Sequence, residues 1–239
     1  MICFAVSDIH GHYTALKAAL DKAGFDPKNE QHRLICCGDY FDRGTENLKV
    51  LQYLDRLKNK VLLRGNHEDM LLEIFRTGRL KEHNFRNGTV ETIAELFGKY
   101  AIDAFGRIDF GGKTRMLDRI TDFINETVDY YESGQYVFTH GWLPTGIREE
   151  GFYIDPHWRT ASPERWQKAR WIKWNEMYTA CDRLPDQTIV CGHVPSFYAH
   201  KFDPSRESMD PSLFFGDGVI VLDAGTSTSG TVNVFMFEE

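Results

Sequence analysis

The segment Leu62-Leu63-Arg64-Gly65-Asn66-His67-Glu68-Asp69 decides how this 239-residue chain folds. An apolar run stops at a glycine, and an amide, an imidazole and two carboxylates follow at once. Glycine frees the backbone to turn sharply where a strand ends. In an open α/β sheet, side chains at such a turn lie at the carboxyl edge of the strands, where ligands bind. The segment therefore predicts a strand that carries functional side chains to one edge of a sheet.

Four other apolar runs end in the same way, with polar side chains beside a glycine. The side chains at these ends are Asp8 and His10, Asp39 and Asp42, His140, and His193. Folded as a sheet, all five ends meet along one edge and offer enough ligands for two divalent ions that share a carboxylate. Such a pair, roughly 3.5–4 Å apart, clamps the attacking and leaving oxygens of a phosphoryl group. Carboxylates and imidazoles without thiolates suit Mn, Fe or Zn in a reactive site better than a structural zinc site.

The first third of the chain alternates between strand and helix patterns. Short apolar runs at residues 2–6, 34–37 and 61–63 predict buried strands, and amphipathic patterns at 13–23 and 48–57 predict helices between them. This order is typical of a parallel sheet with right-handed crossovers. We therefore expect an α/β fold.

Residues from about 70 to 133 are polar, mostly helical in pattern and rich in glycine, which predicts a helical insertion over the sheet edge. Further strands are expected at 136–138, 188–191, 219–222 and 232–237. Five tryptophans between residues 142 and 174 are expected to pack in the core. No repeat or second domain is evident, so we expect one domain over residues 1–239.

Composition limits the classes of partner. A formal charge of −7 argues against a nucleic-acid polymer held by bulk electrostatics. No apolar run approaches the ~20 residues that a membrane helix needs, so no membrane association is expected. Five cysteines without a CxxC pair are expected to be buried thiols in a reducing compartment. With no leader pattern at the N-terminus, we expect a cytoplasmic protein. Its oligomeric state stays open.

The motifs DIHGH (8–12), GDYFDRG (38–44) and RGNHED (64–69), followed by Thr139-His140-Gly141 and Gly192-His193, resemble a known family. They are similar to the phosphoprotein phosphatases, the dinuclear-metal Ser/Thr protein phosphatases of bacterial and phage type among the calcineurin-like metallophosphoesterases. The resemblance implies a β-sandwich flanked by helices, with two divalent ions per chain: Mn²⁺ first, Fe or Zn as options. The implied ligands are Asp8, His10 and Asp39 for one ion, and Asp39, Asn66, His140 and His193 for the other, with Asp39 bridging.

The same resemblance implies a role for each remaining site residue. A hydroxide formed from water between the ions would attack phosphorus directly. His67 would protonate the leaving group, Asp42 would orient His67, and Arg43 would bind phosphate oxygens with Asn66. The family's second phosphate-binding arginine is replaced by Lys173, with Arg170 nearby. Lysine is a point charge and not a planar fork, so this exchange alters phosphate binding.

The function implied is hydrolysis of phosphomonoesters, foremost phosphoserine and phosphothreonine in proteins, with small phosphoesters as other substrates. A first alternative is a diadenosine tetraphosphate hydrolase, which would cleave a phosphoanhydride. A second, of another class, is a catalytically silent adaptor that binds metal without turnover. Nucleotide release from a dinucleotide would favour the first alternative, and metal binding without any product would favour the second.

Other polar residues near the motifs are expected to be structural. Arg64 is expected to form a structural ion pair. Glu68 is expected to cap the following helix or to face solvent. Four histidines without motifs around them are expected at the surface: His32, His83, His157 and His200.

Overall fold

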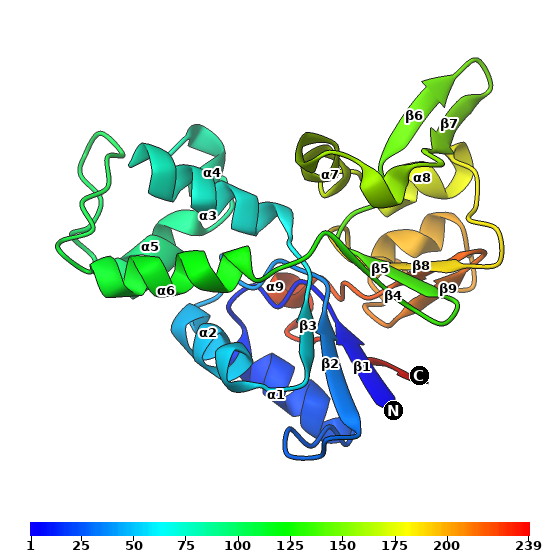
Figure 1. Ribbon diagram of the computed structural model, residues 1–239, viewed down its shortest axis with the longest axis horizontal. Coiled ribbons are helices and arrows are strands. Elements are labelled where there is room, and N and C mark those ends of the chain that lie inside the picture. Colours follow the sequence, from blue (N-terminus) through cyan, green and yellow to red (C-terminus); the bar gives the residue numbers. More distant parts are fainter.

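Two β-sheets pack face to face at the centre of the molecule in the computed structural model, which describes residues 1–239 (Figure 1). The first sheet is β11 (Phe235–Glu238), β1 (Ile2–Val6), β2 (His32–Cys36) and β3 (Lys60–Leu62), in that spatial order. β1, β2 and β3 are parallel, and β11 joins β1 antiparallel. Helices α1 (Tyr13–Lys22) and α2 (Asn47–Arg56) form the crossovers. The predicted parallel β-α-β-α-β order is confirmed.

The second sheet has a parallel centre with antiparallel edges. Its strands are β4 (Tyr130–Ser133), β5 (Tyr136–Thr139), β8 (Thr188–Cys191), β10 (Val219–Val221) and β9 (Phe214–Gly216). β5, β8 and β10 run parallel, while β4 and β9 pair antiparallel at the edges. A separate hairpin of β6 (Thr145–Arg148) and β7 (Gly151–Ile154) projects away from both sheets (Figure 1). A β-sandwich flanked by helices was expected, and the structure shows it.

Side-chain alternation along the strands builds a separate core on each face. Cys3 and Ala5 on β1 face the second sheet, in a fully apolar layer that also contains Phe138 and Val190. The intervening residues of β1 point the other way, toward the helices. Because each strand is covered on both sides, the runs read as continuous apolar segments in the sequence.

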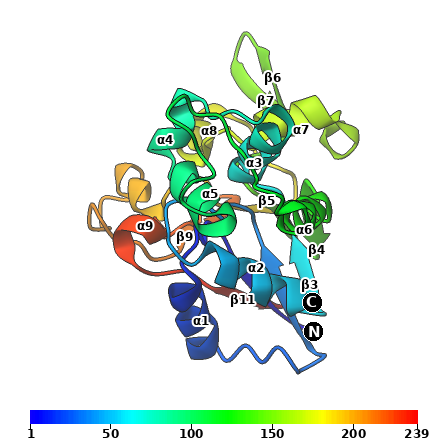
Figure 2. The ribbon, with the colours of Figure 1, turned by 90° about the vertical axis from the view of Figure 1, so that its left-hand side faces the viewer.

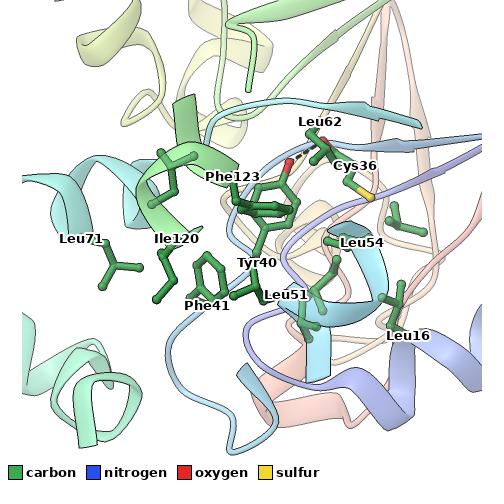
Figure 3. Packing of buried hydrophobic residues seen from close by; sticks show 14 of the residues in the cluster. Leu16, Cys36, Tyr40, Phe41, Leu51, Leu54, Leu62, Leu71, Ile120 and Phe123 are labelled. Carbon is green, nitrogen blue, oxygen red and sulfur yellow. Dashed lines mark hydrogen bonds between the residues drawn. The ribbon is translucent and has the colours of Figure 1, made fainter. Parts of the chain in front are cut away.

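The core beneath the helices surrounds one buried tyrosine. Tyr40 packs among residues of α2 and of the helices beyond it, including Leu54 and Phe123 (Figure 3). Its hydroxyl donates to the carbonyl of Leu63 at 2.6 Å, which satisfies a polar group that would otherwise cost about 1–3 kcal/mol in the interior. The loop after β2 is thereby anchored to the end of β3.

Four helices follow β3 and form a lobe beside the sandwich (Figures 1 and 2). They are α3 (Asn66–Thr77), α4 (Glu82–Arg86), α5 (Thr89–Phe97) and α6 (Thr114–Asn125). We call residues 70–129 the helical insertion. Edge-to-face contacts of Phe97 with Phe75 and Phe110 hold it together. Residues 130–133, expected at its end, form β4 instead.

The tryptophan-rich segment is mostly core, as expected. Trp142, Trp158, Trp166 and Trp174 are at most 2% exposed, whereas Trp171 is 47% exposed. The segment contains α7 (Pro163–Ala169) and α8 (Trp174–Ala180), with the turn η1 (Trp158–Thr160) before them. Two short elements complete the fold: the turn η2 (Ser196–Lys201) and helix α9 (Thr226–Ser229).

Several smaller expectations are settled by the packing. All five cysteines are buried and free, as predicted. His32 was expected at the surface but is partly buried against Phe4, with ring centroids 5.0 Å apart, and stacks on Phe25 at 6.2 Å, because β2 turns it toward the α1 side of the sheet. None of the helices has the length and apolar character needed to cross a membrane.

Candidate functional site

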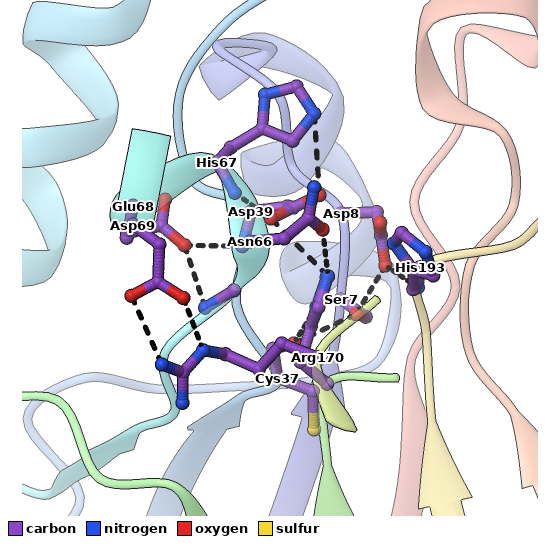
Figure 4. A network of polar contacts seen from close by, with 12 residues as sticks. Ser7, Asp8, Cys37, Asp39, Asn66, His67, Glu68, Asp69, Arg170 and His193 are labelled. Atoms are coloured by element: carbon purple, nitrogen blue, oxygen red, sulfur yellow. Dashed lines mark hydrogen bonds and ion pairs between the residues drawn. The ribbon is translucent and has the colours of Figure 1, made fainter. Parts of the chain in front are cut away.

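The predicted site residues come together at the carboxyl edge shared by both sheets (Figure 4). Asp8, Asp39 and Asn66 follow β1, β2 and β3 in the first sheet. His140 and His193 follow β5 and β8 in the second. Since parallel strands end at the same side of a sheet, the topology alone brings these residues to one edge.

The backbone at this edge is strained. Seven non-glycine residues in the chain have positive φ, and only Asp186 lies outside the predicted site motifs. The six others are Asp8, His10, Asp39, Asp42, Arg43 and His193. Such residues cost about 1–3 kcal/mol each and persist only where surrounding contacts impose them. Gly38, with φ of 88°, sits so close to Gly65 that a Cβ would lie 2.6 Å from its nitrogen. The loops are thus built to aim side chains, at a cost in stability.

A first cluster contains Asp8, His10 and Asp39. His10 Nδ1 lies 2.9 Å from the carbonyl of Phe41, which turns Nε2 toward the carboxylates. That Nε2 is 3.8 Å from Asp8 Oδ1 and 3.6 Å from Asp39 Oδ2. Both Asp8 Oδ1 and His10 Nε2 are buried without a hydrogen-bond partner. Buried polar atoms are almost always paired, so these two identify a position that suits a cation.

A second cluster shares Asp39 and adds His140, His193 and Asn66. His140 Nδ1 lies 2.7 Å from the carbonyl of Cys37, and its Nε2 lies 2.8 Å from Asn66 Oδ1 and 3.4 Å from Asp39 Oδ1. Ligand atoms of Asp39, His140 and His193 all fall within 4.8 Å of one another. Asp39 therefore offers one oxygen to each cluster.

Burial shapes the electrostatics of the clusters. It raises the pKa of Asp39 well above its usual value, with the neighbouring charge of Asp8 adding to the effect. It lowers the pKa of His10, His140 and His193, which keeps these imidazoles neutral. Neutral imidazoles and crowded carboxylates are the donors that divalent cations stabilise. The residues present fit a pair of divalent metal ions.

Beside the clusters lies a pair formed by His67 and Asp42. His67 Nδ1 is 2.7 Å from Asp42 Oδ2, so Nε2 points toward Asp39, 3.8 Å from its Oδ2. Burial raises the pKa of Asp42 to about 7. Burial, followed by the charge of Arg43, lowers the pKa of His67. Arg43 is exposed, and one of its Nη atoms lies 3.4 Å from His67 Nε2.

The two cations near the end of the tryptophan-rich segment, Arg170 and Lys173, lie in different surroundings. Arg170 is 4% exposed and is held by Asp69, at 2.7 and 3.1 Å (Figure 4). Asp129 accepts a further bond from it at 2.6 Å. Lys173 has a half-exposed side chain whose Nζ pairs with Glu176 at 2.9 Å. Neither cation contacts the clusters directly. The half-exposed Trp171 does approach them, with its ring centroid 6.0 Å from that of His193.

Glu68 is a site residue whose importance the sequence reading missed. It was expected to cap a helix or to face solvent. It does accept the N–H of Gly65 at the start of α3, but it is 0% exposed. It also accepts the N–H groups of Asp39, at 2.9 Å, and Tyr40, at 3.0 Å. Its position three residues after Gly65, typical of a capping box, was the available signal. Glu68 thus fixes the loop after β2 to the start of α3.

Arg64 is structural, as expected, but its partners differ from those predicted. Its Nε donates to Thr127 Oγ1 at 3.0 Å, and an Nη donates to the carbonyl of Ile124 at 2.9 Å. The guanidinium therefore binds the end of α6 and forms no ion pair. Carbonyls at a helix C-terminus lack partners within the helix, which is why a cation is favourable there.

A groove of about 410 Å³ adjoins the site between α3, α4 and the segment after α7. Asp69 and Met70 of α3, His83 of α4 and Trp171 are among its lining residues. Its walls come from α3 and α4 on one side and from Gln167 and Trp171 on the other, and no cluster residue lines it.

Comparisons with known proteins agree with the geometry. The sequence profile described as calcineurin-like phosphoesterase matches residues 3–222. Over 75 residues the chain is 44% identical to serine/threonine-protein phosphatase 2 of Escherichia coli, covering 31% of this chain and 33% of that protein. Over 76 residues it is 40% identical to the symmetrical bis(5'-nucleosyl)-tetraphosphatase of Photorhabdus laumondii, covering 31% and 27%. The chain therefore spans about a third or less of the length of these relatives.

A solved structure shares the fold. The cold-active protein-tyrosine phosphatase of a psychrophilic Shewanella species superposes with a TM-score of 0.54 at 15% identity, covering 100% of this chain and 75% of that one. At this identity the likeness concerns the fold alone. The profile match extends over nearly the whole chain and includes every cluster residue described above. This chain belongs to the calcineurin-like phosphoesterases, a family of metal-dependent hydrolases.

Proposed function

We propose that the protein hydrolyses phosphomonoesters with two divalent metal ions, and that its substrates are phosphoserine and phosphothreonine residues of proteins. One observation carries the proposal: Asp39 belongs to two ligand clusters, and the His67–Asp42 pair lies beside them. Two ions and an adjacent acid are the parts that hydrolysis of a phosphate ester needs.

The ligands divide between the two positions. Asp8, His10 and Asp39 would hold one ion, and Asp39, Asn66, His140 and His193 the other. We propose Mn²⁺ at both, because the donors are oxygens and imidazole nitrogens. When bound, the ions supply Lewis acidity, which neutralises charge on the phosphoryl group and makes a water more acidic.

Around the ions, this chain's own side chains handle the proton and the phosphate. The acid is the imidazolium form of His67, with a proton on each ring nitrogen. Asp42 accepts the Nδ1–H and stabilises this cation, which orients the Nε2–H toward the leaving oxygen, and Nε2 then gives that oxygen its proton. The exposed Arg43 guanidinium binds phosphate oxygens, and the Asn66 amide assists. Lys173 completes phosphate binding only after leaving Glu176, since its Nζ now pairs with that carboxylate.

A second candidate is symmetrical cleavage of a dinucleoside tetraphosphate. It is favoured by the 40% identity over 76 residues to the Photorhabdus laumondii tetraphosphatase. The half-exposed ring of Trp171 beside His193 offers a face on which a base can stack. The reaction would use the same ions and the same His67.

A substrate panel separates the candidates. The chain is incubated with Mn²⁺ and, separately, a phosphoserine peptide, a phosphothreonine peptide, a phosphotyrosine peptide, diadenosine tetraphosphate and small phosphate monoesters. We expect inorganic phosphate from the phosphoserine and phosphothreonine peptides at the highest kcat/KM. Nucleotide release with little peptide turnover would establish the second candidate instead. Two bound metals without any product would show a metal-binding adaptor.

A further inference from the structure

Helix α5 of the helical insertion contacts the acid–base pair directly. Thr89, its first residue, donates from Oγ1 to Asp42 Oδ2 at 2.8 Å. The same oxygen lies 2.7 Å from His67 Nδ1. Thr89 and Asp42 are both 0% exposed, so water does not compete for this contact. One carboxylate oxygen therefore takes a hydrogen bond from the insertion and another from the imidazole.

The other oxygen of this carboxylate has no partner at all. Asp42 Oδ1 is buried and makes no hydrogen bond, so Oδ2 carries the bonds from His67 and Thr89. The buried Thr92 hydroxyl, on the same helix α5, also acts on this carboxylate and lowers the pKa of Asp42, as Thr89 does. Without Thr89, the bond to His67 would remain, and the carboxylate could rotate about it toward the Thr92 hydroxyl. Because His67 takes its tautomer and direction from Asp42, a rotated carboxylate would misdirect Nε2.

The backbone that carries Asp42 needs support from outside. Asp42 and Arg43 have φ of 73° and 67°, a conformation that surrounding contacts must impose. Gly88, just before α5, lies against the backbone of Arg43 so closely that a Cβ would overlap the Arg43 nitrogen. The start of α5 therefore packs against the strained loop at Arg43, the residue after Asp42.

A second contact from the same helix holds the far end of the loop. Glu95 accepts the backbone N–H of Asn47 at 3.1 Å, its Nδ2 at 2.7 Å, and the N–H of Leu48 at 2.9 Å. Asn47 Oδ1 in turn accepts the N–H of Asp42 at 3.0 Å. Thr89, at the start of α5, thus contacts the Asp42 carboxylate directly. Glu95, near the end of α5, holds Asn47, which in turn accepts the backbone N–H of Asp42.

We propose that Thr89 is a positioning residue for the general acid, acting through Asp42, and that α5 of the helical insertion sets the direction of the His67 imidazole. This inference rests on the proposed function, in which His67 protonates the leaving oxygen. It assigns a task to a segment that carries none of the recognisable motifs. Loss of the Thr89 hydroxyl lowers kcat on substrates whose leaving group needs a proton. It leaves the metal ligands unchanged.

The test compares Thr89→Val with Thr89→Ser on a series of aryl phosphates of rising leaving-group pKa, with Mn²⁺. We expect Thr89→Val to lower kcat roughly 5- to 30-fold on the poorest leaving groups, the equivalent of one buried hydrogen bond, with KM unchanged. The loss of kcat in Thr89→Val becomes smaller as the leaving group improves and is smallest for p-nitrophenyl phosphate. Thr89→Ser keeps the hydroxyl and has the wild-type kcat on every substrate. If Thr89→Val does not fold, the same substrates are tested with Thr89→Ala, for which we expect the same loss of kcat.

The matched control is Thr127→Val, the same change at a buried threonine that bonds Arg64 and the end of α6. It lowers the unfolding temperature but leaves the leaving-group dependence as in the wild type. If Thr127→Val steepens that dependence as much as Thr89→Val does, the effect is general loosening and the proposal is overturned.

A second readout is independent of turnover. In the zinc-loaded 239-residue chain, the Nδ1 proton of His67 gives a downfield NMR signal when it is hydrogen-bonded to Asp42. We expect Thr89→Val to shift or broaden this signal, with two zinc ions still bound. An unchanged signal would overturn the proposal whatever the substrate is. Absence of turnover on every phosphoester would instead overturn the proposed function. The NMR signal would still decide whether Thr89 positions Asp42 and His67.

Discussion

The sheet edge and the helical insertion contribute to one site in different ways. Residues of the sheet edge, such as Asp39 and His140, are candidate ligands held by short loops, and they lie within recognisable motifs. The helical insertion reaches the same site through Thr89 and Glu95, which lie in no motif. The comparison teaches that the candidate ligands are held by loops at the strand ends, whereas the direction of His67, the proposed acid, would depend on a helix packed beside the site.

The largest expected effect lies at the sheet edge. Asp39→Ala removes the oxygens that both clusters share, so metal pairing and activity should be lost together, with kcat/KM falling on the order of 10³-fold or more. Elemental analysis and phosphatase assays on the same sample check this. Asp186→Ala is the control, since Asp186 has a similar φ of 58° outside the site motifs. Two retained metals in Asp39→Ala would show that the carboxylate is not shared.

The next effect separates chemistry from metal binding. His67→Asn should keep both metals and lower kcat by ~10² on substrates with poor leaving groups, because only proton delivery is lost. A single-turnover assay on a phosphopeptide measures it. His157→Asn, at an exposed histidine, should match the wild type. Equal turnover of His67→Asn and wild type would remove His67 from the role of acid.

A third change tests what joins the two loops of the sheet edge. Glu68→Gln leaves at least one of the backbone N–H groups of Gly65, Asp39 and Tyr40 facing an amide NH₂. We expect the free energy of unfolding in urea to fall by about 1–3 kcal/mol. Glu73→Gln, on a partly exposed face of the same helix, should change it far less. Equal effects of the two changes would contradict the role given to Glu68.

The smallest expected effect is at Glu46, the residue before α2. The Thr14 N–H and then Lys49 lower the pKa of Glu46 to about 2, so its charged form stabilises the fold. This contribution is complete above the unfolded pKa of about 4.5 and is lost as pH falls toward 2. Urea unfolding at several pH values should show wild type more stable than Glu46→Gln near neutral pH. The gap should close in acid, and a gap that widens there would have the wrong sign.

Local patterns were enough to predict the parts of the fold that depend on neighbours in sequence. Apolar runs ending at glycines gave the parallel strands and the side chains at their ends. The edge strands β4 and β9 and the β6–β7 hairpin were not predicted, since their residues are only partly buried and show weak alternation. Strand β11 begins three residues later than expected, at Phe235 instead of 232.

Contacts between distant segments could not be predicted. Thr89 meets Asp42 across 47 residues, and Glu95 meets Asn47 across 48. Arg170 is sequestered by Asp69 and Asp129, a pairing that no spacing in the sequence indicates. Such contacts depend on how helices pack onto loops, which periodicity does not encode.

The most direct test of the central claim is anomalous diffraction from a crystal grown with excess Mn²⁺. We expect two manganese ions per chain, with Asp39 contacting both, Asp8 and His10 on one side, and His140 and His193 on the other. A single ion, or two ions of which only one touches Asp39, would contradict it.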